Sequence, residues 1–303
     1  MKLTITPVPP YDFDLSVRIF LDGDEQIRNY ENGRYQQVIR VNEKLVLVNI
    51  KSSGSVDAPK LRVELEYNEE ISITDLQKTK EIIASSLNLG LDLASFYKDV
   101  KNDRIMAVIT AKLRGLKSPS TPTVFESLVS SIIEQQISLR VAHSMESKVV
   151  KSFGDALSLN GKAYYAFPTP QALASVTIEQ LRGCGLSSKK AEYITGVAKS
   201  IVEGNLNLEG LKELEDTSAV IERLLKMRGI GVWTAEMTVL RGMHRLEEMP
   251  ADDLGLRKCI AHYYSKDRRL SADEARRIAK KWGEWQGLAS FYLIIAWHLG
   301  IEA

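Results

Sequence analysis

The segment from Leu224 to Ala235 holds the residues whose order most suggests chemistry, because two glycines separate two helical stretches there. Glycine adopts positive φ and lets another backbone approach closely. A turn at Gly229-Ile230-Gly231 would leave the first N–H groups of the next helix unpaired, and these donors with the helix dipole form an anion site. Ile230 would pack inward and fix the turn. An ordinary helix corner explains the same spacing, so both interpretations stay open.

Two acids follow the second glycine by about twenty residues, in the segment Pro250-Ala251-Asp252-Asp253. The proline ends an extended segment, and an acid then begins a helix. An Asp at this position is most often only an N-cap. A carboxylate can also stabilise positive charge that develops during a reaction. The pattern alone therefore does not separate a cap from a catalyst.

Composition limits the class of protein. The 303 residues are 44% hydrophobic and 26% charged, which suits a globular protein of two domains. No apolar run is long enough for a membrane span, and we read no export signal, so we expect a cytoplasmic, nucleoid-associated protein without a membrane partner. Cys184 and Cys259 are too few for a disulfide framework or a four-cysteine cluster. Residues 254–282 carry nine Lys and Arg against three Asp and Glu, which is compatible with phosphate contacts.

The elements that would position these residues form two groups. Residues 16–21, 35–41, 44–51 and 61–67 are rich in strand-forming residues and are separated by turn signals, which predicts an antiparallel meander of about four or five strands. Thr74 with Gln77 predicts a capping box for a helix to about Leu87, and residues 93–113 continue as a helical stretch. We therefore predict an N-terminal antiparallel sheet domain with connecting helices over residues 1–116.

Everything after Thr123 has the pattern of helices joined by short turns. Apolar residues recur at helical spacing over residues 125–153, and the last helices are expected at 272–282 and 288–299. Capping boxes are predicted at Thr177 with Gln180 and at Ser271 with Glu274. The predicted fold is mostly α, with an all-helical domain over residues 117–303 beside the α+β sheet domain.

The order of the segments is similar to that of the helix–hairpin–helix DNA glycosylase superfamily, and most of all to the AlkA-type (inducible) 3-methyladenine-DNA glycosylases. The matching segments are Pro9-Pro10-Tyr11-Asp12, Phe125-Glu126, Glu134-Gln135-Gln136-Ile137-Ser138, Phe167-Pro168-Thr169-Pro170-Gln171, Lys189-Lys190-Ala191-Glu192, Gly229 to Ala235, Leu240-Arg241-Gly242, Asp252-Asp253, Trp282, Trp285 and Trp297. The resemblance implies a DNA glycosylase of base excision repair that flips a damaged base from double-stranded DNA and hydrolyses its N-glycosidic bond. The expected substrates are 3-methyladenine and 7-methylguanine, with hypoxanthine and ethenoadenine as further candidates.

The resemblance also assigns roles in the reaction. It places the catalytic carboxylate on Asp253, with Asp252 as the second candidate. Trp233 and Trp297 match aromatic pocket positions, where ring faces would hold a cationic purine with about 1–2 kcal/mol. Met237 stands where the bacterial type has another aromatic residue, so the pocket would differ in substrate preference. Bifunctional relatives carry a lysine at the position of Trp233, and its absence here predicts a monofunctional enzyme without lyase activity.

Contacts to DNA are implied at two places. Gln136 matches the wedge that fills the space left by the flipped nucleotide. Residues Gly229, Ile230, Gly231 and Thr234 match the hairpin that grips the phosphate backbone without reading sequence. The family often binds a monovalent cation on hairpin carbonyls, which would here be those of Met227 and Gly229. We expect no other cofactor, no side-chain metal site, no iron–sulfur cluster, and a monomer.

Two other functions remain open from the sequence. One is an oxidised-base glycosylase of the same superfamily, although the missing lysine at Trp233 counts against its bifunctional form. The other is a non-catalytic helix–hairpin–helix DNA-binding protein in which Asp253 is only a cap. A Ser/His or metal-dependent hydrolase is not indicated, because the histidines stand in no known nucleophile or metal spacing. These are His143, His244, His262 and His298.

Overall fold

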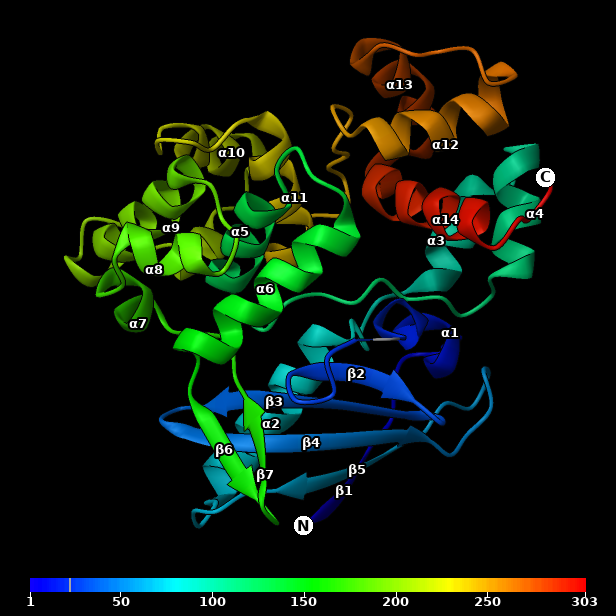
Figure 1. The fold of residues 1–303 in the computed structure, drawn as a ribbon. Helices are drawn as coiled ribbons and strands as arrows, with labels where there is room; N and C mark the ends of the chain where they lie inside the picture. The colour runs from blue at the N-terminus through cyan, green and yellow to red at the C-terminus, as the bar shows by residue number, and fades with distance from the viewer. Residues whose placement is uncertain (22) are drawn as a thin grey trace.

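The computed structural model describes residues 1–21 and 23–303, with a five-stranded antiparallel sheet lying beneath a larger helical part (Figure 1). The strand order is β1-β5-β4-β3-β2. The strands are β1 (Lys2–Ile5), β2 (Arg28–Glu31), β3 (Arg34–Val41), β4 (Lys44–Ser52) and β5 (Leu61–Glu66). The predicted mostly-α fold with an N-terminal antiparallel sheet is confirmed.

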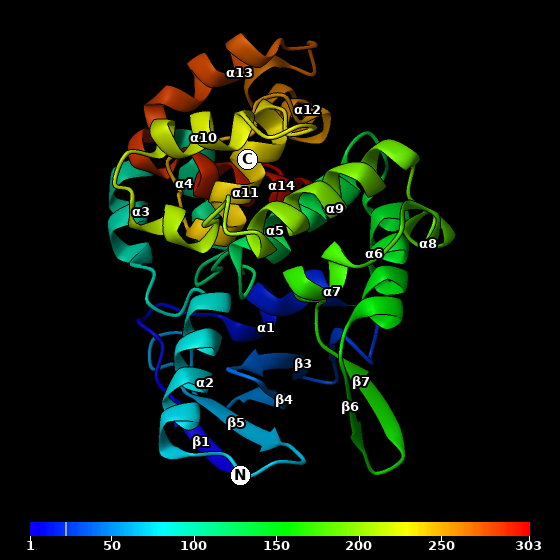
Figure 2. The same cartoon turned by 90° about the vertical axis from the view of Figure 1, so that its left-hand side faces the viewer.

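Each face of the sheet is covered, because side chains alternate along the strands. Ile39, Val48 and Val63 are buried on the face that packs against Ile83 of helix α2 (Ile73–Ser86). Val38 and Leu47 face the other way and pack against a second hairpin of β6 (Ala156–Leu159) and β7 (Lys162–Tyr165). Figure 2 shows α2 and this hairpin on opposite sides of the sheet.

The prediction of a strand over residues 16–21 is wrong. The chain there forms α1 (Phe13–Val17) and the 3-10 helix η1 (Arg18–Phe20). The Asp12 side chain accepts a hydrogen bond from the Leu15 N–H, and this N-cap starts the helix before the apolar run. The other three predicted strands agree with β3, β4 and β5, whereas β1 and β2 were not predicted.

Most predicted helix starts agree with the structure. The capping boxes at Thr177 with Gln180 and at Ser271 with Glu274 are both present. The box that opens α2 uses Ser72 and Asp75 instead of Thr74 and Gln77. The stretch at residues 93–113 is two helices, because Asp103 caps a new one.

The helical part begins at residue 93 and is interrupted once by strands. Its helices are α3 (Leu93–Val100), α4 (Arg104–Lys112), α5 (Val124–Glu134), α6 (Leu139–Phe153), α7 (Pro170–Ala174), α8 (Ile178–Gly183), α9 (Ser188–Val202), the 3-10 helix η2 (Glu209–Glu213), α10 (Thr217–Leu225), α11 (Val232–Met243), α12 (Leu254–Ser265), α13 (Ala272–Ala279), the 3-10 helix η3 (Lys280–Trp285) and α14 (Gln286–His298). The expectation of helices alone after residue 123 is wrong for the β6–β7 hairpin. No helix of the described chain is both long and apolar enough to cross a membrane.

The helices pack into two hydrophobic cores. One core joins α5 and α6 with α7 to α11. The other joins α12, α13 and α14 with α3 and α4, so Phe96 and Met106 pack with Trp282 and Tyr292. Helices that precede residue 117 thus share a core with the last helices of the chain. The division of the sequence at residues 116 and 117 stays a prediction.

Candidate active site

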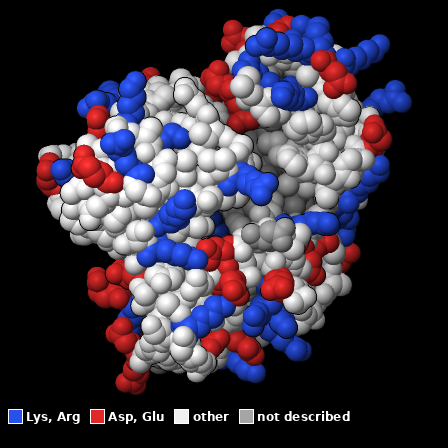
Figure 3. Space-filling model, in the orientation of Figure 1, with Lys and Arg blue, Asp and Glu red and all other residues white. Residues whose placement is uncertain are grey.

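A cleft of about 2340 Å³ lies between the two helical cores and reaches the sheet domain. Its walls come from the start of α6, the glycine turn before α11, the segment from Pro250 to Leu256, α14, and residues around η1. Figure 3 shows the hollow between the two helical lobes, with Lys and Arg side chains beside it and over α12 and α13. Asp253 and the predicted pocket residues Trp233, Met237 and Trp297 all line this cleft, where they could meet a ligand.

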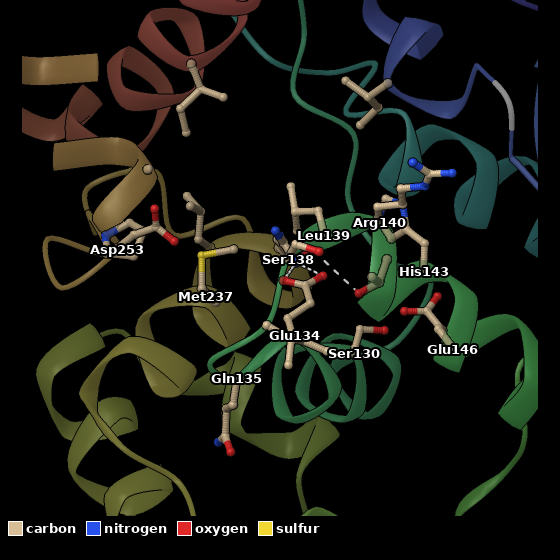
Figure 4. Close-up of a pocket in the computed structure, with 18 of the residues that line it drawn as sticks. Ser130, Glu134, Gln135, Ser138, Leu139, Arg140, His143, Glu146, Met237 and Asp253 are labelled. Carbon is tan, nitrogen blue, oxygen red and sulfur yellow. Dashed lines mark hydrogen bonds and ion pairs between the residues drawn. The ribbon is translucent and has the colours of Figure 1, made fainter. Parts of the chain in front are cut away.

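Asp253 lies at the start of α12 with its side chain in the cleft wall. Its Oδ1 accepts a hydrogen bond from the Leu256 N–H at 2.8 Å, so the residue is indeed an N-cap. Its Oδ2 accepts one from Nε1 of Trp233 at 3.1 Å. Figure 4 shows the carboxylate turned toward Met237 and the cavity. Asp253 can therefore cap α12 and still face the cleft, because the cap uses only Oδ1 and leaves Oδ2 on the side of Trp233.

The predicted pocket residues line the same cleft as Asp253. Trp233 is the second residue of α11, and Met237 is buried one turn later on the same face of that helix. Trp297, near the end of α14, is 40% exposed and lines the cleft, so part of its side chain is accessible to a ligand. Asp252 is exposed and lies 3.9 Å from Arg276, which makes it the weaker candidate for catalysis.

The hairpin formed by residues 227–232 has the geometry that its glycines predict. Gly229 has φ +88°, and a Cβ there would lie 2.2 Å from the ring of Tyr193. Ile230 is buried, and Gly231 is the N-cap of α11 without a side chain to cap it. In the described chain, the N–H groups of residues 232–234 have no hydrogen-bond acceptor. They are available for an anion such as a phosphate.

Thr234 differs from what its predicted role suggests. Its side chain is 2% exposed, and its hydroxyl accepts a hydrogen bond from Gln135 Nε2 at 3.0 Å. Only the backbone N–H of Thr234 could therefore reach DNA. Gln136, in contrast, is exposed and has φ +56°, at the tip of the turn between α5 and α6. The neighbouring Leu139 is 54% exposed at the start of α6.

The two hairpin carbonyls that were predicted to bind a cation each accept a hydrogen bond already. The carbonyl of Gly229 accepts a hydrogen bond from Gln135 Nε2 at 3.0 Å, and that of Met227 accepts one from the Ile230 N–H at 3.2 Å. Each oxygen keeps a second lone pair. A Na⁺ or K⁺ ion on Met227 and Gly229 stays a prediction. Among the described residues, no group of three His, Cys, Asp or Glu side chains could hold a metal.

Three ion pairs between a buried Glu and a partly exposed Arg were not predicted. Glu134 pairs with Arg241 at 2.8 Å, and Glu236 on α11 pairs with Arg276 at 2.6 Å. Arg28 of the sheet domain lies 3.6 Å from Glu126 of α5. The partners in these pairs stand 40 to more than 100 positions apart. No local sequence pattern could have joined them.

Comparison with known proteins places the chain among repair enzymes. The model of the family described as HhH-GPD superfamily base excision DNA repair protein matches residues 129–284. The chain belongs to this superfamily. A Bacillus subtilis HhH-GPD relative, named DNA-3-methyladenine glycosylase, is 31% identical over 94% of this chain and 94% of its own length. Escherichia coli DNA-3-methyladenine glycosylase 2 is 29% identical over 59% of this chain and 60% of its own length.

Two solved structures share the whole architecture of this chain. The 3-methyladenine DNA-glycosylase of Archaeoglobus fulgidus covers 99% of this chain and 100% of its own, with a TM-score of 0.86 and 26% identity. An 8-oxoguanine glycosylase/lyase of Clostridium acetobutylicum, solved with double-stranded DNA, covers 99% of both chains with a TM-score of 0.77. Its identity is 22%, so this likeness shows the fold alone.

Proposed function

We propose that this HhH-GPD protein is a monofunctional DNA glycosylase that removes alkylated purines from double-stranded DNA. The observation that carries this proposal is Asp253 in the cleft wall, held by hydrogen bonds from Leu256 and Trp233, with Trp297 lining the same cleft. The names of the relatives in Bacillus subtilis and Escherichia coli support 3-methyladenine as a substrate. We expect 7-methylguanine as a second substrate, with hypoxanthine and ethenoadenine as further candidates. We expect the protein to act as a monomer at the nucleoid.

The carboxylate would act on the sugar of the flipped nucleotide. When the bond between C1′ and the base nitrogen breaks, its electrons leave with the base and positive charge builds on the deoxyribose. Asp253 stabilises this charge, and water then adds to C1′ and loses a proton. A methylated purine is already a good leaving group because it carries positive charge. One carboxylate is therefore enough.

The pocket would select bases by their charge. The ring faces of Trp233 and Trp297 attract a cationic methylated purine, with about 1–2 kcal/mol when water is excluded. Met237, which is buried and lines the same cleft, offers a polarizable side chain without a ring face. We expect a pocket that accepts purines of somewhat different shape.

Strand cleavage is not expected, because no amine lies where a Schiff base would form. Trp233 occupies the position that a lyase-type relative uses for lysine. The lysines that line the described part of the cleft, Lys148 and Lys151, both belong to α6. Lys151 there is 2.7 Å from Asp24. The expected product is an abasic site in an uncut strand. Alkali should cleave the strand at this site, whereas the enzyme should not.

Base release by Asp253→Asn tests the proposal. We expect a loss of roughly 100- to 1000-fold in the single-turnover rate on duplexes with 3-methyladenine, while DNA affinity is kept. Asparagine keeps the oxygen that caps α12, so the fold should be unchanged, whereas Asp253→Ala should cost about 1 kcal/mol. Asp252→Asn is the matched control and should release base at close to the wild-type rate.

Two results would reject this function. Release by Asp253→Asn at the wild-type rate would leave Asp253 as a cap only. If the wild-type protein releases 8-oxoguanine faster than 3-methyladenine, it is an oxidised-base glycosylase of the same superfamily.

A further inference from the structure

Gln135 connects the two segments assigned to DNA. It is the C-cap of α5 and stands immediately before Gln136. Its Nε2 donates to the carbonyl oxygen of Gly229 and to Oγ1 of Thr234, each at 3.0 Å. Gln135 is one of the residues that line the cleft, and Figure 4 shows its side chain pointing away from Asp253 and Met237. We call these two hydrogen bonds the Gln135 bridge.

The bridge holds a backbone conformation that is unfavourable by itself. Gln136 has φ +56°, a left-handed conformation that costs roughly 1–2 kcal/mol for a residue with a Cβ. Such a conformation persists only where the surroundings impose it. The residue before Gln135 is also held, because the Glu134 carboxylate binds Arg241 Nη1 at 2.8 Å. Both residues that precede the exposed Gln136 are thus fixed to the hairpin and α11.

Helix α11 therefore positions three predicted functional groups. In its first turn, the Thr234 hydroxyl accepts one hydrogen bond of the Gln135 bridge, and Trp233 donates a hydrogen bond to Asp253. Its N-terminal N–H groups are the predicted phosphate site. We propose that Gln135 is a positioning residue that makes the wedge turn, residues 135–138, and the phosphate-gripping hairpin move as one rigid unit during base flipping. This inference rests on the proposed glycosylase function.

The physical reason is the free energy that flipping requires. Extruding a paired base costs a few kcal/mol, and a base without a partner costs less. The Gln136 wedge can displace a base only if the turn that carries it, residues 135–138, does not change conformation under the load. Without the bridge, the wedge turn could rotate while the hairpin stays on the phosphate. Flipping of paired bases should then suffer more than flipping of unpaired ones.

The test compares one lesion in two duplexes, 7-methylguanine opposite cytosine and 7-methylguanine opposite an abasic analogue. Gln135→Glu keeps the side-chain shape and removes both N–H donors. Its single-turnover rate should fall about tenfold or more on the paired lesion and less than threefold on the unpaired one, as expected for a lost buried hydrogen bond. Thr234→Val should shift the rate ratio in the same direction, and Thr234→Ser, which keeps the acceptor, should restore it. Gln171→Glu, on the exposed face of α7, is the matched control and should change neither rate.

A second readout does not depend on chemistry. In the Asp253→Asn background, the fluorescence of 2-aminopurine beside the lesion should rise more slowly when Gln135→Glu is added. Equal losses on both duplexes, or an unchanged fluorescence rise, would overturn the positioning role. A wild-type protein that releases no base would instead refute the glycosylase proposal, while the fluorescence experiment would still test the bridge.

Discussion

Trp233 donates a hydrogen bond from its indole Nε1 to Oδ2 of Asp253, at 3.1 Å. The residue assigned to the base pocket thus also orients the carboxylate assigned to catalysis. The helices that these residues begin contribute to different hydrophobic cores, since α11 packs with α5 and α12 packs with α14. This hydrogen bond fixes the relative position of the two walls of the cleft.

Trp233→Phe separates these two roles. Phenylalanine keeps a ring face for the base but has no N–H for Asp253. We expect the single-turnover rate of base release to fall roughly tenfold, because a hydrogen bond to a charged group is lost, with a smaller change in DNA affinity. A wild-type rate in this variant would show that the indole N–H does not orient the carboxylate.

Gly229→Ala tests the hairpin. The added Cβ would lie 2.2 Å from the Tyr193 ring, and φ +88° is strained for alanine. We expect a loss of about 1–3 kcal/mol in unfolding free energy, measured by denaturant titration, and weaker DNA binding. Gly231→Ala is the control, because its Cβ meets nothing within 4 Å. Equal losses in the two variants would contradict the importance of the contact with Tyr193.

Trp297→Ala tests whether the pocket recognises charge. The ring is 40% exposed at the cleft and can stack on a flipped base. We expect release of cationic 7-methylguanine to fall about tenfold more than release of neutral hypoxanthine, since cation–π attraction acts only on the former. Parallel losses for both bases would mean that Trp297 contributes packing alone.

Glu126 should make stability depend on pH. Burial raises its pKa from 4.5 to about 7, although Arg28 acts in the opposite direction. The folded protein therefore keeps a proton that the unfolded chain releases, and the contribution of Glu126 to stability is lost as pH rises from about 4.5 to 7. The Tm of Glu126→Gln relative to wild type should increase between pH 5 and pH 7 and then level off. A Tm difference that does not change with pH would contradict the raised pKa.

The sequence predicts the local backbone structure of the candidate site well. Glycines that need positive φ and acids that begin helices leave signals within a few residues, so Gly229 and Asp253 could be found without a structure. No such signal marks Tyr193 or Gln135. The Tyr193 ring lies against Gly229, and Gln135 donates a hydrogen bond to Thr234. Their contacts exist only after helices far apart in the sequence pack together.

The same reasoning explains the errors in the fold. The apolar run at residues 16–21 resembles a strand, but the cap at Asp12 decides in favour of a helix. The β6–β7 hairpin carried a usable signal, because Asn160-Gly161 is a typical two-residue hairpin turn and both residues have positive φ. The edge strands β1 and β2 are only four residues long, which is too short for their sequence pattern to be recognised.

The core shared by α3, α4 and the last three helices has an evolutionary consequence. The wall that carries Asp253 is built from residues 93–112 together with the last helices of the chain, since Phe96 packs with Tyr292. A recombination or protease cut near residue 116 would remove part of that wall, whereas one before residue 93 would spare it. The part of this enzyme that evolution can transfer as one unit should therefore begin before α3, about twenty residues upstream of the predicted boundary at residues 116 and 117.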